Sequence, residues 1–235
     1  MENASKALLI AGGVLIALLV LGALLLMFNQ LSGYQKSNVN LEKDTQLATF
    51  NDQFAQYARN DLKGNDLISL VNKVVDYNKK TSGAGTINYD IKITVSIELG
   101  QAFVQKFGVN GTLTAFPSPY TYVIDKNSTK VNNAFLKTIE TMRSYEEDSS
   151  IGRNTMSELS SNYEALKAYY IDHDTTRGKT VKDITGRSIP RVENNISIVE
   201  QYREYSELKT ATFRCAEGPI YENDQFSKVG FKFIK

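Results

Sequence analysis

An apolar run near the start of the chain constrains the fold more than any other feature. The run extends from Ala7 to Phe28 without a charged residue or a proline, and only the six residues MENASK precede it. A helix of about 22 residues is roughly 33 Å long, which matches a bilayer hydrocarbon core of about 30 Å. We therefore expect a transmembrane helix at 7–28, after a short segment at 1–6, with the lipid bilayer as its partner.

We expect this run to be kept as a single-pass anchor and not to be removed as a signal peptide. It is longer than the h-region of a signal peptide, roughly 7–15 residues, and no A-x-A cleavage site follows Met27. The flanking charges are nearly balanced: Lys6, the amino terminus and Glu2 lie on one side, and Lys36, Glu42, Lys43 and Asp44 lie on the other. The positive-inside rule leaves both orientations open, and we favour the one that places the C-terminal domain outside the cell.

The rest of the chain has the composition of an ordinary water-soluble domain. The 235 residues include 27 Lys and Arg and 26 Asp and Glu, so the net charge of +1 provides no overall field that would attract nucleic acid. Cys215 is the only cysteine, which excludes an intramolecular disulfide. We expect a helical stalk at 29–63 and one α+β head domain at 64–235.

A stripe of apolar residues follows the anchor. Leu47, Phe50, Phe54 and Tyr57 are spaced by three, four and three residues, which places them on one face of a helix. Two partners fit such a face: the sheet of the same chain, or the helix of a neighbouring copy. The second partner makes these four residues candidates for self-association.

Small residues recur four positions apart within the anchor itself. Ala7 and Ala11 form one such pair, and Gly13 and Ala17 form another. Small residues let two membrane helices approach closely, so these four positions are also candidates for self-association. We expect a homo-oligomer or another protein as a partner.

The head is expected to begin with a helix and a long strand. Asn65 or Asp66 is a suitable N-cap for a helix over 67–75. From Ile87 to Leu99, apolar and polar residues alternate strictly, which predicts a half-buried strand. A strand with one face towards water favours an antiparallel sheet. The predicted fold class is α+β, with a long N-terminal helix, transmembrane and then extended, followed by an antiparallel sheet packed with helices.

The remaining elements are predicted from shorter patterns. Apolar spacing and turn residues indicate strands at 109–116 and 120–125, helices at 134–142 and 156–170, a loop at 172–188, a helix at 198–208, and strands at 210–215 and 226–234 joined by a loop at 217–225.

The chain contains no catalytic signature. His173, the only histidine, lies between Asp172 and Asp174, but no H-E-x-x-H, C-x-x-C or G-x-S-x-G motif occurs. A catalytic pair of Cys215 and His173 requires an activated thiolate beside the imidazole, which residue spacing does not provide. We expect no enzyme activity, no cofactor and no metal, and a tethered Cys/His hydrolase is the least favoured alternative.

Two polar clusters have a simple interpretation. The triplet Gly178-Lys179-Thr180 matches the end of a phosphate-binding loop, but His173 occupies the position of the required first glycine. Glu146, Glu147 and Asp148 lack the alternate ligand spacing and central glycine of a calcium loop. We interpret the first as a surface loop and the second as a solvated acidic turn.

The order of these parts resembles that of type IV pilin-like proteins, in which a short N-terminus precedes an apolar helix, its polar continuation and an antiparallel sheet. The resemblance implies that the apolar half-helix anchors the subunit and packs in a filament core, with the head facing outward. Two family features are missing: an acidic residue within 7–28 and a basic leader that ends in glycine. Residues 1–80, with MENASKALLIAGG at the start, also resemble single-pass membrane-anchored surface proteins of Gram-positive bacteria, a resemblance that brings no known activity with it.

These observations predict a membrane-anchored structural or interaction protein of the cell surface, with a pilin-like filament subunit as its assembling form. The alternative is a membrane-tethered module that binds a ligand or partner, for which the loop at 172–188 is the candidate contact surface. The absence of a strong net charge leaves nucleic acid out of both hypotheses.

Overall fold

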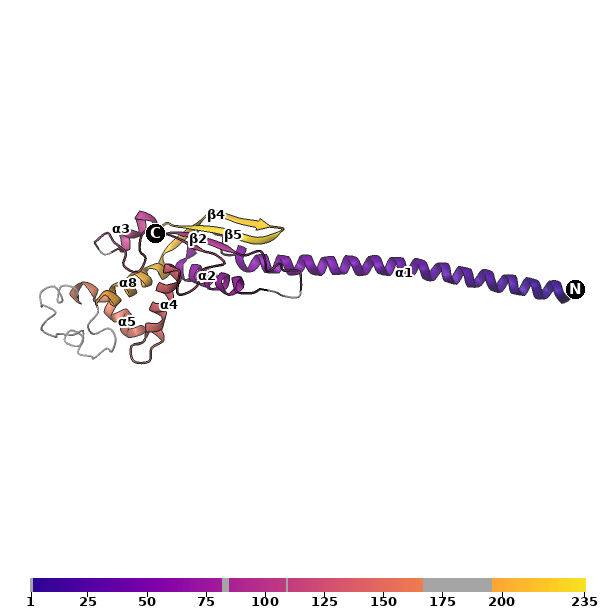
Figure 1. The fold of residues 1–235 in the computed structure, drawn as a ribbon, viewed down its shortest axis with the longest axis horizontal. Helices are drawn as coiled ribbons and strands as arrows, with labels where there is room; N and C mark the ends of the chain where they lie inside the picture. Colours follow the sequence, from indigo (N-terminus) through magenta and orange to yellow (C-terminus); the bar gives the residue numbers. More distant parts are fainter. Residues whose placement is uncertain (1, 82–84, 109, 167–195) are drawn as a thin grey trace. The chain divides into compact units, whose positions relative to one another are not determined.

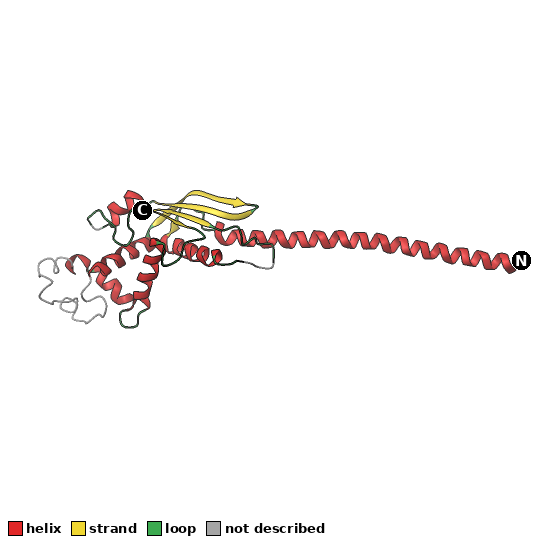
Figure 2. Ribbon diagram, viewed as in Figure 1, coloured by secondary structure: helices red, strands yellow, loops and turns green. Residues whose placement is uncertain are grey.

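The computed structural model describes residues 2–81, 85–108, 110–166 and 196–235 (Figure 1). The chain divides into two compact units, Met1–Thr49 and Phe50–Lys235. The fold is α+β, with a long N-terminal helix and a five-stranded sheet packed with helices, as the sequence predicts (Figure 2).

Helix α1 runs from Glu2 to Ala55 without a break. In the described part of the chain it is the one helix that is long and apolar enough to span a membrane. Its large apolar side chains from Leu8 to Phe28 are 48–79% exposed, so nothing in the described chain covers them. The predicted stalk at 29–63 needs correction at its end, because α1 stops at Ala55 and the compact head unit already starts at Phe50.

The head begins with strand β1 (Leu62–Lys63) and helix α2 (Gly64–Asn78). The backbone N–H of Gly64 donates to the carbonyl oxygen of Ala211, and a Cβ at Gly64 would lie 1.7 Å from the carbonyl oxygen of Leu208. This close approach fixes the start of α2. The predicted N-cap at Asn65 or Asp66 is therefore wrong, and the N-cap is Lys63, which makes no side-chain capping bond.

The sheet has the order β1-β4-β5-β2-β3. Its other strands are β2 (Thr94–Glu98), β3 (Thr121–Ile124), β4 (Thr212–Glu222) and β5 (Gln225–Phe233). Three pairs are antiparallel, but β2 and β5 are parallel, so the sheet is mixed and not purely antiparallel as predicted. The alternation of apolar and polar residues along one strand indicates which face of the strand is buried. It does not indicate whether the neighbouring strand runs parallel or antiparallel.

The predicted strand at 87–99 is shorter in the structure and begins only at Thr94. Ile91 and Ile93 are buried as expected. However, their backbone groups form hydrogen bonds with side chains and not with a neighbouring strand. The amide of Asn78 accepts from the N–H of Ile93 at 2.9 Å and donates to its carbonyl oxygen at 2.8 Å. The hydroxyl of Tyr77 donates to the carbonyl oxygen of Ile91 at 2.9 Å.

Helix α3 (Gly100–Phe107) was not predicted, and the predicted strand at 109–116 does not form over its described residues. Gly100 has a φ of +66°, which turns the chain directly from β2 into the helix. Phe103 and Phe107 lie four residues apart and pack ring to ring, 4.9 Å between centroids. The strand predicted at 120–125 is confirmed as β3.

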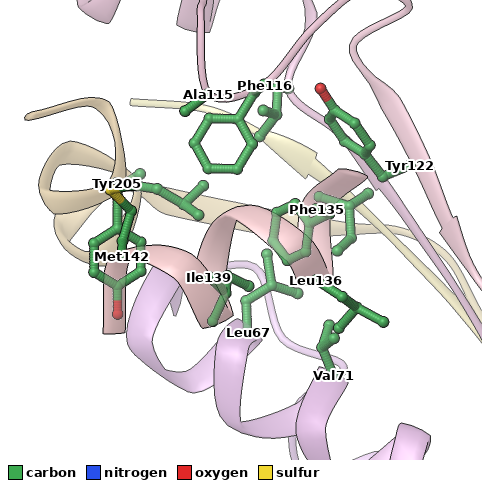
Figure 3. Packing of buried hydrophobic residues seen from close by; sticks show 14 of the residues in the cluster. Leu67, Val71, Ala115, Phe116, Tyr122, Phe135, Leu136, Ile139, Met142 and Tyr205 are labelled. Atoms are coloured by element: carbon green, nitrogen blue, oxygen red, sulfur yellow. The ribbon is translucent and has the colours of Figure 1, made fainter. Parts of the chain in front are cut away.

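Helices α4 (Ala134–Glu147) and α8 (Ile196–Thr210) confirm two predicted helices, and α5 (Gly152–Ser161) confirms only the first part of the helix predicted at 156–170. The side chain of Asn133 caps α4 by accepting from the N–H groups of Phe135 and Leu136. Helices α2, α4 and α8 bury their apolar faces against one another in a single core (Figure 3), which includes Leu67, Val71, Phe116, Phe135, Ile139 and Met142.

Strands β4 and β5 form a hairpin with a two-residue turn in place of the predicted loop at 217–225. Asn223 and Asp224 have φ values of +49° and +63°, a pattern that matches the right-handed twist of hairpin strands. The side chain of Asn51 donates to the carbonyl oxygen of Asp224 and accepts from the N–H of Phe226. The last turns of α1 thereby hold the hairpin turn.

Candidate functional site

A polar pocket of about 550 Å³ lies where α4, α5 and α8 meet. Most of its charged lining comes from the ends of these helices, because α4 ends at Glu147 and α5 begins at Gly152. The charged and aromatic side chains of the lining are Arg143, Glu146, Glu147, Arg153, Tyr205 and Lys209.

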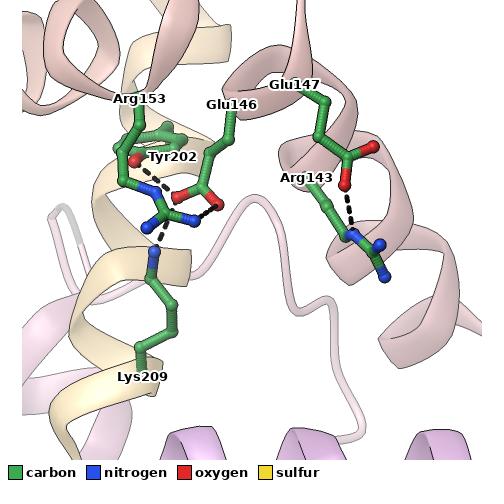
Figure 4. A network of polar contacts seen from close by, with 6 residues as sticks. All are labelled: Arg143, Glu146, Glu147, Arg153, Tyr202 and Lys209. Carbon is green, nitrogen blue, oxygen red and sulfur yellow. Dashed lines mark hydrogen bonds and ion pairs between the residues drawn. The ribbon is translucent and has the colours of Figure 1, made fainter.

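Glu146 is the centre of the polar contacts in this pocket (Figure 4). Its side chain is only 5% exposed, and its Oε1 atom accepts from the Tyr202 hydroxyl at 2.8 Å and from Lys209 Nζ at 2.7 Å. Arg153 approaches Oε2 at 3.4 Å. Burial acts to raise the pKa of Glu146, but the bonds from Lys209 and Tyr202 outweigh it and hold the pKa below its ordinary value.

Lys209 connects this carboxylate to two aromatic rings of its own helix. Its Nζ atom lies 4.5 Å from the ring centroid of Tyr205 and 5.6 Å from that of Tyr202. An ammonium group at this distance is attracted to the ring face. Burial raises the pKa of Tyr202, and the hydrogen bond to Glu146 adds to this effect.

The solvated acidic turn predicted at Glu146, Glu147 and Asp148 is therefore wrong for Glu146. Its partners Tyr202 and Lys209 are more than fifty residues away in the chain, so local sequence gives no indication that the carboxylate is buried. Glu147 matches the prediction better, because it is exposed and pairs with Arg143 across one helical turn, 2.7 Å from Nε to Oε1.

Tyr205 is the buried aromatic residue of the described pocket lining, and its side chain contributes a hydroxyl group. The residue is 4% exposed, and its hydroxyl, which is not fully buried, makes no hydrogen bond with the described residues. Burial raises the pKa of Tyr205 to about 12, so the hydroxyl is protonated and able to donate at neutral pH.

Glu204, also on α8, is fully buried and has a structural role. Its carboxylate accepts from the N–H of Thr114 at 2.9 and 3.1 Å and from the N–H of Ala115 at 2.8 Å. Burial raises the pKa of Glu204, and these hydrogen bonds oppose that rise only in part. The carboxylate thus provides hydrogen-bond acceptors for the backbone of the segment that was predicted to be a strand at 109–116.

Of the two residues of the hydrolase hypothesis, only Cys215 lies within the described residues. Cys215 lies half-buried in β4, with its Sγ atom 3.3 Å from the carbonyl oxygen of Gly218. Burial raises the pKa of this thiol, which opposes the thiolate that a nucleophile requires. His173, the triplet at 178–180 and the predicted contact loop at 172–188 lie outside the described residues.

The apolar stripe at the end of α1 packs within its own head. Phe50 and Phe54 are 9% and 3% exposed, and their rings contact Tyr77 at 5.1 and 6.0 Å between centroids. Tyr57 packs against the same core, whereas Leu47 lies in the first unit and is half-buried. Of the two partners considered for this stripe, the chain's own fold covers Phe50 and Phe54, so these rings need no second copy.

The small residues of the anchor have no packing role in the described chain. A Cβ added at Gly13 would meet nothing within 4 Å, and the same holds for Gly22. Ala7, Ala11 and Ala17 are exposed on the same helix.

Among the described residues, no three His, Cys, Asp or Glu side chains are grouped so that they would hold a metal ion.

The pocket does not follow from the sequence patterns, although α8 contains an indication of it. Tyr202, Tyr205 and Lys209 follow one another at intervals of three and four residues, which places their polar ends on one helix face. No pattern pointed to Arg153, because its partner is on another helix.

The chain matches no protein-family model, no curated protein and no solved structure.

Proposed function

We propose that this is a membrane-anchored structural or interaction protein, in which residues 7–28 span the bilayer and the head unit 50–235 makes its contacts in water. The observation that supports the proposal most strongly is the uncharged run of exposed apolar side chains in α1. Burial of one large aliphatic side chain is worth roughly 1.5–3 kcal/mol, so more than ten of them favour the bilayer by tens of kcal/mol.

Self-association of α1 is part of this proposal. A glycine in a helix interior is about 1 kcal/mol less favourable than alanine, and Gly13 gains no contact inside the chain that would offset this. The small pairs Ala7 with Ala11 and Gly13 with Ala17 favour close contact with a second membrane helix. A pilin-like filament is the extended form of such an assembly, with the head on the outer surface of the cell.

Membrane fractionation tests the anchor. The full chain is expected to sediment with membranes and to remain there after an alkaline wash, which strips peripheral proteins. Leu19→Arg introduces a charge at the centre of the run, which costs roughly 2.5–3.5 kcal/mol and is expected to lower the integrated fraction. Leu19→Ala is the matched control and is expected to stay integrated. Release of the wild-type chain by the wash would contradict the proposal.

A ligand-binding head is a second candidate function, and the pocket between α4, α5 and α8 favours it. Its volume of about 550 Å³ falls in the range of roughly 300–1,000 Å³ that is typical of small-molecule sites. The two functions are compatible, because the anchor lies in the first unit and the pocket lies entirely in the second.

A further inference from the structure

Cations outnumber anions in the pocket between α4, α5 and α8. Three side chains of the lining, Arg143, Arg153 and Lys209, carry positive charge, whereas two, Glu146 and Glu147, carry negative charge. Arg143 is neutralised by Glu147, and Lys209 by Glu146. Among the described residues of the lining, Arg153 is the cation that remains, because the Glu146 carboxylate has already been matched by Lys209.

The position of Arg153 is more typical of a ligand contact than of a structural ion pair. Its side chain is 73% exposed, and its contact with Glu146 is long, at 3.4 Å. An exposed pair of this kind contributes roughly 0–1 kcal/mol to stability. Glu146 keeps its two short bonds to Tyr202 and Lys209 without Arg153, so the fold does not depend on this guanidinium.

The unused hydrogen-bonding groups around this position are mainly donors. A guanidinium has five N–H donors, of which Arg153 uses one and Arg143 uses its Nε–H. The hydroxyl of Tyr205 belongs to a residue that is 4% exposed, lines the pocket and has no hydrogen-bond partner among the described residues. Oxygen atoms with negative charge are the acceptors that such a donor set prefers.

We propose that this pocket binds a small molecule through an oxyanion group, either a carboxylate or a phosphate, that accepts from Arg153 and from the Tyr205 hydroxyl. This inference rests on the ligand-binding candidate function and is independent of the membrane anchor. Among the described residues of the lining, Arg153 is the cation without a matched anion and Tyr205 is a neutral donor, so a metal cation or an ammonium ligand is disfavoured at the same position.

Thermal unfolding of the full chain in non-ionic detergent tests this proposal. Near-ultraviolet circular dichroism of the tyrosines follows the tertiary packing of the head while inorganic phosphate or succinate is titrated, with sodium chloride at equal ionic strength as the reference. A ligand that binds only the folded state raises Tm in proportion to the logarithm of its concentration above Kd. We expect at least one of the two probes to raise Tm above the sodium chloride reference.

Three variants assign the effect to the pocket. Arg153→Gln is expected to weaken binding of the active probe at least tenfold, and Tyr205→Phe, which removes only the hydroxyl, several-fold. Arg214→Gln removes the same charge from the exposed side of β4, outside the pocket, and is expected to bind as the wild type does. Far-ultraviolet circular dichroism establishes that each variant keeps the helix and strand content of the wild type.

The results of the titrations distinguish a phosphate ligand from a carboxylate ligand. Stabilisation by phosphate alone identifies a phosphate group, and stabilisation by succinate alone identifies a carboxylate. The proposal is overturned if neither probe raises Tm above the sodium chloride reference, or if Arg153→Gln and Arg214→Gln bind equally well. Neither result would alter the outcome of membrane fractionation, so failure of the binding site is distinguishable from failure of the anchor.

Discussion

Glu146 and Glu204 are both buried, yet their surroundings shift their pKa values in opposite directions. Charged Lys209 and the hydroxyl of Tyr202 reach Glu146 and lower its pKa against the effect of burial. Glu204 receives neutral backbone N–H groups, which do not compensate for its removal from water, so its pKa rises. The partner's charge, and not burial alone, decides whether a carboxylate in this head is held ionised.

The ion pair of Lys209 with Glu146 is expected to contribute more to stability than an exposed pair of equal length. Lys209→Gln leaves a carboxylate that is 5% exposed without its cation, and we expect the free energy of unfolding to fall by about 2 kcal/mol. Lys228→Gln is the matched control, because Lys228 pairs with Glu217 at the same 2.7 Å on the surface. We expect that change to cost less than about 1 kcal/mol. Equal losses in urea denaturation would show that burial adds nothing.

Glu204 is expected to make the stability of the head depend on pH in mildly acidic solution. Because its pKa is raised in the folded state, the folded chain binds this proton more tightly than the unfolded chain does. The stability that this proton contributes is fully present below pH 4.5, the ordinary pKa of a glutamate side chain. It is lost as the pH rises through the pKa of Glu204 in the folded state. The variant Glu204→Gln lacks this titration.

Urea denaturation of the wild type and Glu204→Gln over a series of pH values checks this expectation. The free energy of unfolding of the wild type, relative to that of the variant, is expected to decrease as pH rises above 4.5. A relative increase over the same range would mean that the hydrogen bonds from Thr114 and Ala115 lower the pKa of Glu204 below its ordinary value.

At the scale of elements, local patterns predicted the elements that local contacts determine. The helices α2, α4 and α8 follow from apolar spacing, and the capping residue Asn133 fits the start of α4. The failures depend on distant contacts. The strand predicted from Ile87 is shortened because Asn78 takes the place of a neighbouring strand, and the parallel pairing of β2 with β5 joins segments more than one hundred residues apart.

The pocket was missed for the same reason as these elements. Glu146, Arg153 and Lys209 come from three helices, and only the packed structure brings them within hydrogen-bond distance of one another. The helix that is long and apolar enough to span a membrane was predictable, because length and apolar composition are properties of consecutive residues. Sequence alone also identified the stripe at Phe50 and Phe54, but it left the identity of the partner open.

Helix α1 is expected to associate with a second copy through its small residues. Gly13→Leu places a bulky side chain at the proposed contact, and the fraction of chain captured by amine cross-linking at Lys36 and Lys43 in membranes is expected to fall about fivefold. Gly22→Leu is the matched control, since both glycines have open space around them in the single chain. Wild-type membranes that yield no cross-linked dimer would remove self-association from the proposed function.

At the scale of the whole molecule, the two units present different surfaces to their surroundings. The first unit is a single helix whose large apolar side chains are exposed, whereas the second has a continuous core that includes Phe50 and Phe233. We propose that residues 7–28 of the first unit lie in a bilayer and that the second unit lies in water. Lys36 and Lys43 are exposed between the apolar run and the head, so trypsin is expected to cleave the chain between these two parts.

Trypsin treatment of isolated open membranes, followed by mass spectrometry of both fractions, tests this claim most directly. Cleavage after Lys36 or Lys43 is expected to release the head into the soluble fraction, and the apolar peptide Ala7–Lys36 is expected to remain with the lipid. Recovery of that peptide in the soluble fraction, or of a head that stays with the membrane after cleavage, would contradict the account.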